Sequence, residues 1–268
     1  MVPPVRLDQA LVDRGLVGSR SLARRLVLAG QVSVDGYAVD KPGTPIKAAC
    51  ELIVAQAPRF VSRGGDKLEP VLAASGIDVF AATCLDVGAS TGGFTDCLLQ
   101  HGAEAVIAVD VGYGQLAWKL RQDERVYVLE RTNARYLSTE SLPPELPGGI
   151  TMLTIDVSFI GLLKVLPAVT RLTEPRSQAL VLVKPQFEAG PKDVEHGGVV
   201  RSSSVRRRCV RSVAEGAREL GWCVHRAHPS PLRGPHGNWE CFVHLGRAPG
   251  PGGTEDTSRL DDLEVPDD

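Results

Sequence analysis

Long apolar runs are missing from this chain of 268 residues. The longest, such as LVLAG and ALVLV, fall far short of the roughly 18–20 consecutive apolar residues that a membrane-spanning helix needs. The first ten residues, MVPPVRLDQA, lack the apolar segment that a secretory signal peptide carries. We therefore expect a protein of the cytoplasm that does not insert into membranes.

Paired cysteines are absent as well. The six cysteines are scattered along the chain, and none of them forms a Cys-x-x-Cys pair. In a chain of this size that distribution is typical of a reducing compartment rather than of a disulfide framework. Cys223, His225, His228, His236 and Cys241 are close in sequence, but their spacing matches no zinc pattern. We expect no metal site.

The charge is unevenly distributed. The chain is 43% hydrophobic and 23% charged, which indicates a globular protein long enough for one large domain and a small one. Its net charge is −2, yet residues 248–268 hold seven acidic residues and one arginine, net −6, which leaves +4 on residues 1–247. The body can therefore accept a nucleic-acid partner without requiring one. The acidic tail has too few large apolar residues to fold, and we expect it to be disordered.

Residues 1–57 predict a small α+β module. RLDQALVDRGL and SRSLARRLVLAG place apolar residues at helical spacing, with Ser19 as an N-cap and Gly30 beyond the end of the second helix. Short strands follow, two of them joined at Asp35-Gly36, a pair typical of hairpin turns. Residues 58–61 form the predicted linker.

Residues 62–247 alternate between strand-like and helix-like segments. The strand-like runs are CLDVG, AVIAVDVG, VYVLER, MLTIDVS and ALVLVKP, and helices are expected to begin near Gly93, Gln115, Gly161 and Ser203. Such alternation predicts a doubly wound, mostly parallel α/β sheet with helices on both faces. CVHRAHPSPL and NWECFVHL, with no helix between them, predict a final antiparallel pair. The stretch VSRGGDKLEP, residues 61–70, reads as a loop.

A glycine-rich turn, LDVGASTGGFTDCLL, follows the first of these strands and opens a helix. It is not G-x-G-x-x-G, which argues against a dinucleotide. Asp110 ends the next strand, where a carboxylate can bind ribose hydroxyls. Together these features predict an S-adenosylmethionine site, the alternative being a purely structural turn. The candidate cofactor-binding residues are Asp86, Gly88, Ser90, Gly92, Gly93, Phe94, Asp110, Asn133 and Asp156. For Asn133, expected at the end of the third strand, an ordinary Asx turn is an equal alternative.

Charged residues end two apolar strands abruptly. Asp156 follows MLTI and Lys184 follows ALVLV, at the edge of the sheet where the cofactor should lie. A lysine in that position needs a partner, and Asp156 can supply one. Glu240 lies in a later strand-like run, and Lys67 precedes the first strand. Taken alone, Lys67 reads as a solvated surface charge.

These motifs resemble the TlyA family. SRGGDKL, LDVGASTGGFT, VDVGYGQLAWKLR, LERTNAR, DVSFI, LVKPQFE and SPLRGPHGNWE occur in the family's order, and the first module resembles an S4 RNA-binding domain, so that the likeness covers about residues 5–246. It implies a Rossmann-like class I methyltransferase domain that transfers a methyl group from S-adenosylmethionine to a cytidine 2′-hydroxyl of ribosomal RNA in assembled subunits. Some members modify both subunits and some only the large one. The family's catalytic set falls on Lys67, Asp156, Lys184 and Glu240.

Chemistry assigns roles to that set. A 2′-hydroxyl is a poor nucleophile, so we expect Lys184 to orient it and to stabilise the developing oxyanion, with Asp156 holding the lysine. Lys67 and Glu240 would form an outer pair that shapes the ribose pocket. The candidate RNA-binding residues are Arg6, Arg20, Arg24, Arg25 and Arg63.

Several alternatives stay open. The basic run RSSSVRRRCVR, residues 201–211, is either an exposed helix face or a phosphate contact. The haemolysin label often given to the family suggests a membrane-active protein, although no spanning or suitable amphipathic segment supports it. A catalytically silent RNA-binding or assembly factor is the third possibility. We expect a monomer.

Overall fold

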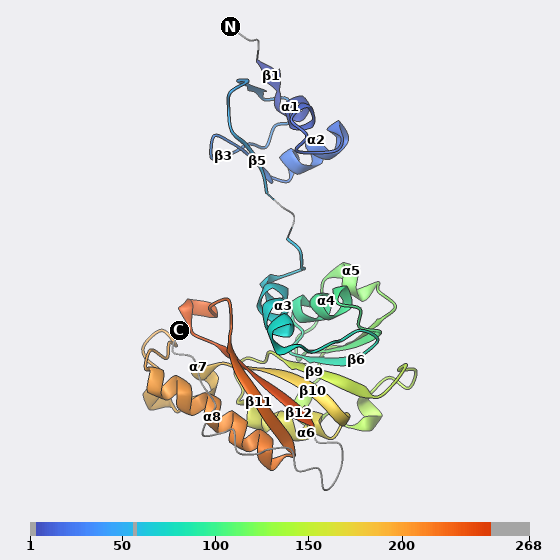
Figure 1. Cartoon of the computed structure of the whole chain (residues 1–268), viewed down its shortest axis with the longest axis vertical. Coiled ribbons are helices and arrows are strands. Elements are labelled where there is room, and N and C mark those ends of the chain that lie inside the picture. The colour runs from blue at the N-terminus through green and yellow to red at the C-terminus, as the bar shows by residue number, and fades with distance from the viewer. Residues whose placement is uncertain (1–3, 56–57, 248–268) are drawn as a thin grey trace. The chain divides into compact units, whose positions relative to one another are not determined.

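The computed structural model describes residues 4–55 and 58–247 (Figure 1). The chain divides into two compact units, the first ending at Arg59 and the second beginning at Phe60. Phe60 is buried in the core of the second unit, and the Val61 amide donates to Asp96 Oδ2 at 2.8 Å. The last two residues of the predicted linker, 58–61, therefore pack with the second unit. The predicted acidic tail, 248–268, lies outside the described residues.

The first unit is a small α+β domain. Its elements are β1 (Val5–Arg6), α1 (Leu7–Asp13), α2 (Arg20–Leu28), β2 (Val32–Val34), β3 (Tyr37–Ala38), β4 (Pro45–Ile46) and β5 (Leu52–Val54). Ser19 caps α2 by accepting a hydrogen bond from the Leu22 amide at 3.2 Å, as predicted. Val34 pairs with Tyr37 across the predicted Asp35-Gly36 turn. Leu7, Leu11, Ala23 and Val27 form the centre of its core.

The second unit is an α/β domain. Its helices are α3 (Arg63–Ser75), α4 (Gly93–Gln100), α5 (Trp118–Arg121), α6 (Leu166–Thr170), α7 (Pro185–Glu188) and α8 (Ser203–Glu219). Its strands are β6 (Thr83–Val87), β7 (Ala105–Val109), β8 (Val126–Leu129), β9 (Ile150–Ile155), β10 (Thr173–Val183), β11 (Trp222–Pro229) and β12 (Cys241–Arg247). Single 3₁₀ turns are η1 (Ala134–Tyr136), η2 (Thr139–Ser141), η3 (Leu162–Lys164), η4 (Pro191–Asp193) and η5 (Pro235–Gly237).

The seven strands form one sheet in the order β11-β12-β10-β9-β6-β7-β8. The pairs from β10 to β8 are parallel, whereas β12 is antiparallel to both β10 and β11, which confirms the predicted final pair. Figure 1 shows α3, α4 and α5 on one face of the sheet and α6 and α8 on the other. The strand order reverses between β6 and β9, and in such sheets the crevice at the reversal is where ligands bind.

The stretch 61–70 is not the predicted loop. Ser62 caps α3, and Gly64 and Gly65 lie in the first turn of that helix. Both glycines serve close packing rather than backbone freedom. A Cβ atom on Gly65 would lie 2.1 Å from the ring of Phe60, and one on Gly64 would lie 3.3 Å from the Cα atom of Gly93. Lys67 is therefore fixed on a helix that is packed against the start of α4.

Two helices begin later than predicted. The helix expected near Gln115 begins at Trp118 and makes only four residues of α5. The one expected near Gly161 starts as the 3₁₀ turn η3 and becomes α6 at Leu166. Helices at Gly93 and Ser203 begin as predicted. The differences lie in connections, while the strands that form the carboxyl edge of the sheet follow the prediction.

Candidate functional site

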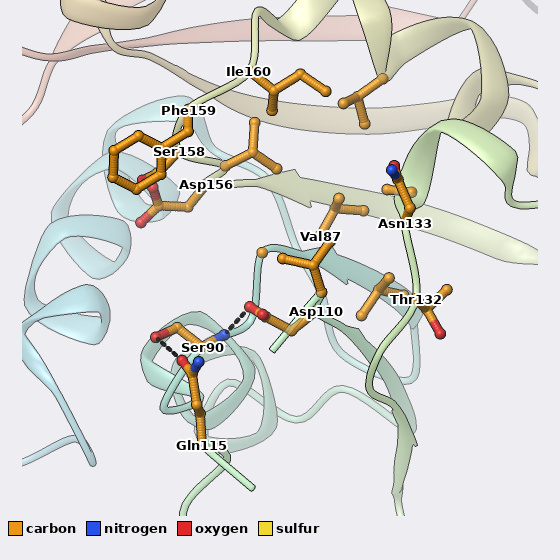
Figure 2. Close-up of a pocket in the computed structure, with 16 residues that line it drawn as sticks. Val87, Ser90, Asp110, Gln115, Thr132, Asn133, Asp156, Ser158, Phe159 and Ile160 are labelled. Atoms are coloured by element: carbon orange, nitrogen blue, oxygen red, sulfur yellow. Dashed lines mark hydrogen bonds between the residues drawn. The ribbon is translucent and has the colours of Figure 1, made fainter. Parts of the chain in front are cut away.

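A cavity of about 430 Å³ opens at the carboxyl edge of the sheet (Figure 2). Its walls come from the ends of four neighbouring parallel strands. Val87 ends β6, Asp110 follows β7, Asn133 comes after β8, and Asp156 follows β9. Phe159, whose side chain is 91% exposed, lies in the loop after β9. This first cavity therefore occupies the crevice at the strand-order reversal.

Asp110 is held in a fixed orientation. Its Oδ2 atom accepts the amide of Ser90 at 2.8 Å, drawn in Figure 2, and its Oδ1 atom accepts the amide of Gly112 at 2.7 Å. Each carboxylate oxygen can accept two hydrogen bonds, so both oxygens keep a second lone pair. An oriented carboxylate with spare acceptor capacity suits a pair of ligand hydroxyls.

Gly88 lets two strand ends come together. Its φ of +85° lies in the left-handed region, and a Cβ atom there would lie 2.4 Å from the carbonyl oxygen of Asp156. The Asp156 amide in turn donates to the carbonyl of Val87 at 2.9 Å. Only glycine allows this approach without displacing the backbone that carries Asp156.

Four of the predicted cofactor residues do not line the first cavity. Asp86 is fully buried beneath it, and Gly92, with a φ of +94°, faces the side chains of Leu116 and Leu120. Gly93 and Phe94 line a second cavity instead. Direct cofactor contact by Asp86 and Gly92 therefore stays a prediction; in this structure the first anchors the strand through two hydrogen bonds and the second forms the turn into α4.

Asp86 is held by two hydroxyls. Thr95 Oγ1 donates to it at 2.7 Å, and Thr154 Oγ1, from the paired position on β9, donates at 2.9 Å. Burial raises the pKa of Asp86 to about 6, and the two hydrogen bonds counteract part of that rise. The sequence missed both threonines because their role depends on sheet register and helix packing.

Asn133 lies beyond the end of the third strand of the domain, β8, rather than at its end as predicted. It follows the end of β8 by four residues and caps η1, where its Oδ1 atom accepts the Arg135 amide at 3.1 Å. It also lines the first cavity. The Asx-turn alternative is therefore confirmed, and the cofactor contact of the same side chain stays a prediction.

The second cavity, of about 320 Å³, adjoins the first. Lys67 and Lys184 line it, together with the start of α3 and the glycine-rich turn. Gly88, Ser90 and Asp156 line both cavities. The three shared residues mark the place where molecules held in the two cavities would meet.

The four predicted catalytic residues form two separate ion pairs. Lys184 Nζ lies 2.5 Å from Asp156 Oδ1, and it donates to Ser158 Oγ at 3.0 Å. Lys67 Nζ donates to Glu240 Oε2 at 2.6 Å. Lys67 and Glu240 are 173 positions apart in the sequence. Ser158, which the sequence reasoning missed, could have been noticed two residues after Asp156 in the same DVSFI motif.

Glu240 differs from its prediction in one respect, since it precedes β12 rather than lying within a strand. It does not line the second cavity itself. Its side chain is buried behind Lys67, where Gly234 leaves room for it, since a Cβ atom there would lie 2.0 Å from Glu240 Oε1. Glu240 can thus act on the cavity only through Lys67.

The predicted RNA-binding arginines of the first unit lie together at α1 and α2. Arg6 and Arg20 both bind the buried carboxylate of Asp8, at 3.0 and 3.2 Å. The hydrogen bond from Arg6, helped by Arg20, lowers the pKa of Asp8 against the opposing effect of burial. Arg24 and Arg25 are exposed on α2, and Arg63 is exposed in the second unit, where it lines the second cavity. Arg6 and Arg20 therefore have a structural partner in addition to any RNA role.

Three further features of the described residues concern metal sites, membrane-spanning helices and disulfides. No group of three or more histidine, cysteine, aspartate or glutamate side chains among residues 4–55 and 58–247 is placed to hold a metal ion. In the same part of the chain, every helix is too short or too polar to cross a membrane. All six cysteines carry free thiols.

Two family models match the chain. The FtsJ-like methyltransferase model matches residues 60–247, and the S4 domain model matches residues 5–52. Each match coincides with one of the two compact units. The likeness therefore extends over nearly all of the described chain.

Individual proteins are similar over the same length. The 16S/23S rRNA (cytidine-2′-O)-methyltransferase TlyA of Mycobacterium tuberculosis is 47% identical over 91% of each chain. Hemolysin A of Brachyspira hyodysenteriae is 39% identical over 90% of this chain and 99% of its own. A solved structure from Streptococcus thermophilus, named as a candidate hemolysin, is 40% identical with a TM-score of 0.71, covering 98% of this chain and 95% of its own.

Proposed function

The chain belongs to the TlyA family of FtsJ-like methyltransferases with an N-terminal S4 domain, and we propose that it methylates the ribose 2′-hydroxyl of cytidines in ribosomal RNA. S-adenosylmethionine is the methyl donor. The observation that carries the proposal is the junction of two cavities at Asp156, with Lys184 paired to that carboxylate on the acceptor side.

The first cavity fits S-adenosylmethionine. Its volume of about 430 Å³ is in the range of a site for a small cofactor. Asp110 offers spare acceptor sites for the ribose hydroxyls, and Asn133 and Thr132 offer polar contacts for the adenine. Gly88 and Ser90 present backbone to the amino-acid end. These residues would hold the donor, which when bound supplies an electrophilic methyl group on a sulfonium.

Lys184 acts on the acceptor oxygen. An ammonium has three N–H donors, and Asp156 and Ser158 take two directions around Lys184. A further N–H of the ammonium donates to the 2′-oxygen as negative charge develops there. The hydroxyl proton passes to the carboxylate of Asp156, which lines both cavities, as the oxygen accepts the methyl group. Since the methyl group is already reactive, alignment of the oxygen supplies a large share of the rate.

Lys67 shapes the ribose side of the second cavity. Its Nζ atom is 2.6 Å from the buried Glu240, so the lysine side chain is fixed rather than free to sample many rotamers. A fixed ammonium in the cavity wall holds the ribose or its phosphate in place. Glu240 is the positioning residue for Lys67, and Asp156 is that for Lys184.

RNA recognition begins with the S4 domain. Arg24 and Arg25 on α2, with the outer N–H groups of Arg6 and Arg20, form a basic surface that contacts phosphates of a folded RNA. Arg63, at the rim of the second cavity, contacts the RNA near the target nucleotide. The large subunit, and in addition the small one, are the proposed substrates. The enzyme works as a monomer in the cytoplasm, without a metal ion.

The two alternatives lack a supporting arrangement of residues. The hemolysin name of some relatives describes those proteins. A liposome-leakage assay tests directly whether this chain has membrane activity. A silent assembly factor has no need for two lysine–carboxylate pairs whose lysines line a cavity beside the cofactor-sized one, because buried or half-buried ion pairs are costly unless they serve a purpose.

Mapping of ribose methylation tests the proposal. Unmodified 30S and 50S subunits are incubated with the protein and S-adenosylmethionine, and 2′-O-methylated nucleotides are located by their resistance to alkaline cleavage. We expect new 2′-O-methylcytidines that require both the protein and the donor. Methylation confined to bases, or none at all on either subunit, would refute the assignment.

A further inference from the structure

The loop between β11 and β12 borders a third cavity, of about 310 Å³. Its lining includes Arg201, Arg206, Arg233, His236 and Trp239, and none of the described residues that line it is acidic. We propose that this arginine pocket binds a backbone phosphate of the RNA strand next to the target nucleotide. The inference rests on the proposed function and adds to it a second RNA-binding site outside the S4 domain.

The arginine pocket is a direct neighbour of the second cavity. Pro235 lines the second cavity, and the next residue, His236, lines the arginine pocket. At the other end of the loop, Trp239 lines the arginine pocket, and Glu240 pairs with Lys67. Because consecutive Cα atoms are about 3.8 Å apart, only the width of one loop separates the two sites. A strand with its nucleotide in the second cavity thus brings an adjoining phosphate to the arginines.

The walls of the arginine pocket are tied together by Asn238. This side chain is 2% exposed, its Oδ1 atom accepts the Val200 amide at 3.1 Å, and its Nδ2 atom donates to the carbonyl of Gly198 at 2.8 Å. The same Nδ2 atom donates to the carbonyl of Pro235 at 3.2 Å. The segment before α8 and the loop before β12 are thereby joined by buried hydrogen bonds, so the pocket is formed before any ligand binds.

The arginines are oriented for an anion. The guanidinium of Arg206 lies 5.7 Å from the centroid of the Trp239 ring, and its Nη2 atom donates to the carbonyl of Arg201 at 2.8 Å. These contacts fix the planar fork that suits phosphate oxygens. Arg201 pairs with Glu195 at 3.0 Å, but both side chains are more than half exposed. An exposed pair of this kind is weak and can yield to a phosphate.

A buried donor in the wall is unpaired. Trp239 is 4% exposed, and within residues 4–55 and 58–247 its indole Nε1 atom has no hydrogen-bond partner. Indole nitrogen only donates, and a buried donor without a partner destabilises the protein. Phosphate oxygens only accept, and one of them, directly or through a bridging water, supplies the missing partner. This feature favours an anionic acceptor ligand over a cation or an apolar group.

Charge-removing variants test the arginine pocket. Arg201→Gln and Arg233→Gln, combined, should lower the affinity for purified ribosomal subunits about tenfold and reduce the slope of log affinity against log salt concentration by about 1. Affinity for S-adenosylmethionine should stay unchanged, because neither arginine lines the first cavity. That binding also confirms that the variant is folded, and the corresponding Arg→Lys variants should show a smaller loss.

The matched control is Arg171→Gln with Arg176→Gln. Both residues are exposed around the start of β10, at the edge of the sheet opposite the cavities, so equal charge is removed without an expected effect on subunit binding. If the wild type methylates subunits and the Arg201/Arg233 variant binds them with unchanged affinity and slope, the inference is wrong and the proposed function stands. If the wild type methylates no subunit, both are wrong.

A second experiment distinguishes an RNA backbone phosphate from a free phosphate compound as the ligand of the arginine pocket. Inorganic phosphate and a short oligoribonucleotide are titrated calorimetrically into the wild type and the double variant. We expect the oligoribonucleotide to bind the wild type and to lose affinity in the variant. Saturable binding of inorganic phosphate that disappears in the variant, while oligoribonucleotide and subunit binding are unaffected, would assign the pocket to a free phosphate compound and overturn the RNA assignment.

Discussion

Asp86 is a carboxylate with no exposed surface, and its two hydroxyl partners do not fully replace water. Burial raises its pKa to about 6. The carboxylate fixes the end of β6 to β9 and α4 from below, which sets the position of the glycine-rich turn above it. Its contribution to the cofactor site is therefore indirect, through the backbone.

Replacement of Asp86 by Asn should change how stability depends on pH. In the wild type the unfolded carboxyl ionises near pH 4 and the folded one near pH 6, so the folded state binds more protons in that window. The free energy of unfolding therefore falls, through this group, by up to about 3 kcal/mol as the pH rises from 4 to 6.

Asp86→Asn removes that dependence because it cannot ionise. Urea unfolding of the two proteins at a series of pH values should show the wild type losing stability relative to the variant across the window. If the difference in unfolding free energy between the two proteins is independent of pH, burial does not shift the pKa of the Asp86 carboxyl.

Individual site residues could be predicted from sequence where a charged residue ends an apolar strand. Asp110, Asp156 and Lys184 were found in this way, and all three lie at the carboxyl edge. The pairing of Lys67 with Glu240 depended on the family resemblance, since no local pattern connects positions 173 residues apart. Contacts that arise from register or packing, such as those of Thr154 and Ser158, were not predicted.

At the scale of elements, α3 decides where Lys67 lies. The helix begins at Arg63 with two glycines, which allow its first turn to touch Phe60 and the start of α4. A Cβ atom on Gly93 would lie 2.4 Å from Ser62 Oγ and 2.8 Å from the Cα atom of Gly64. Three glycines thus bring two helix N-termini into contact, and that contact aims Lys67 at the second cavity.

Gly65→Ala should disrupt this packing. The added Cβ atom would lie 2.1 Å from the ring of the buried Phe60, so either the ring or the helix must move. We expect a loss of about 1–3 kcal/mol in the free energy of unfolding, measured in urea, together with reduced methylation caused by displacement of Lys67. Gly148→Ala is the control, because the nearest atom to its added Cβ, Thr83 Oγ1, is 3.7 Å away. Equal stability of the Gly65 variant and the control would contradict the packing role.

Strands were easier to predict than helices for a physical reason. Each parallel strand from β6 to β10 ends in an apolar run that is followed directly by a glycine or a charged residue, and this pattern is visible in the sequence. The segment of α3 holds two glycines and Pro70, all weak helix formers, and its helical state depends on tertiary contacts that a local pattern does not contain. Intrinsic preference was overridden there by packing.

At the scale of the whole molecule, the proposed RNA contacts are divided between the two units. The S4 domain carries arginines on α2, and the methyltransferase domain carries Arg63 and the arginine pocket. Neither set lines the first cavity. RNA affinity and cofactor affinity should therefore be separable by mutation.

Arg24→Gln with Arg25→Gln tests the S4 contribution. If each arginine neutralises one phosphate, the slope of log affinity against log salt should decrease by about 2, while S-adenosylmethionine binds as before. Filter binding to intact subunits across a salt series measures the first quantity, and calorimetry the second. An unchanged slope would show that Arg24 and Arg25 on α2 do not contact RNA phosphates.

Domain order and fold class followed from sequence, because the switch from a short helical module to α/β alternation is visible in periodicity. The cavities could not be predicted from the sequence, because they depend on how loops from distant positions meet at the sheet edge. Asp156, which lines both cavities, became recognisable as the junction only when the sheet order placed β6 beside β9.

The most direct test of the account is single-turnover transfer of tritium from S-adenosylmethionine to ribosomal subunits by Lys184→Arg, with Lys164→Arg on η3 as control. Arginine keeps the charge but not the point-like ammonium that Asp156 and Ser158 aim. We expect a rate about a hundredfold or more below wild type for Lys184→Arg, with unchanged S-adenosylmethionine affinity and a normal rate for Lys164→Arg. A Lys184→Arg enzyme that transfers methyl groups at the wild-type rate would contradict it.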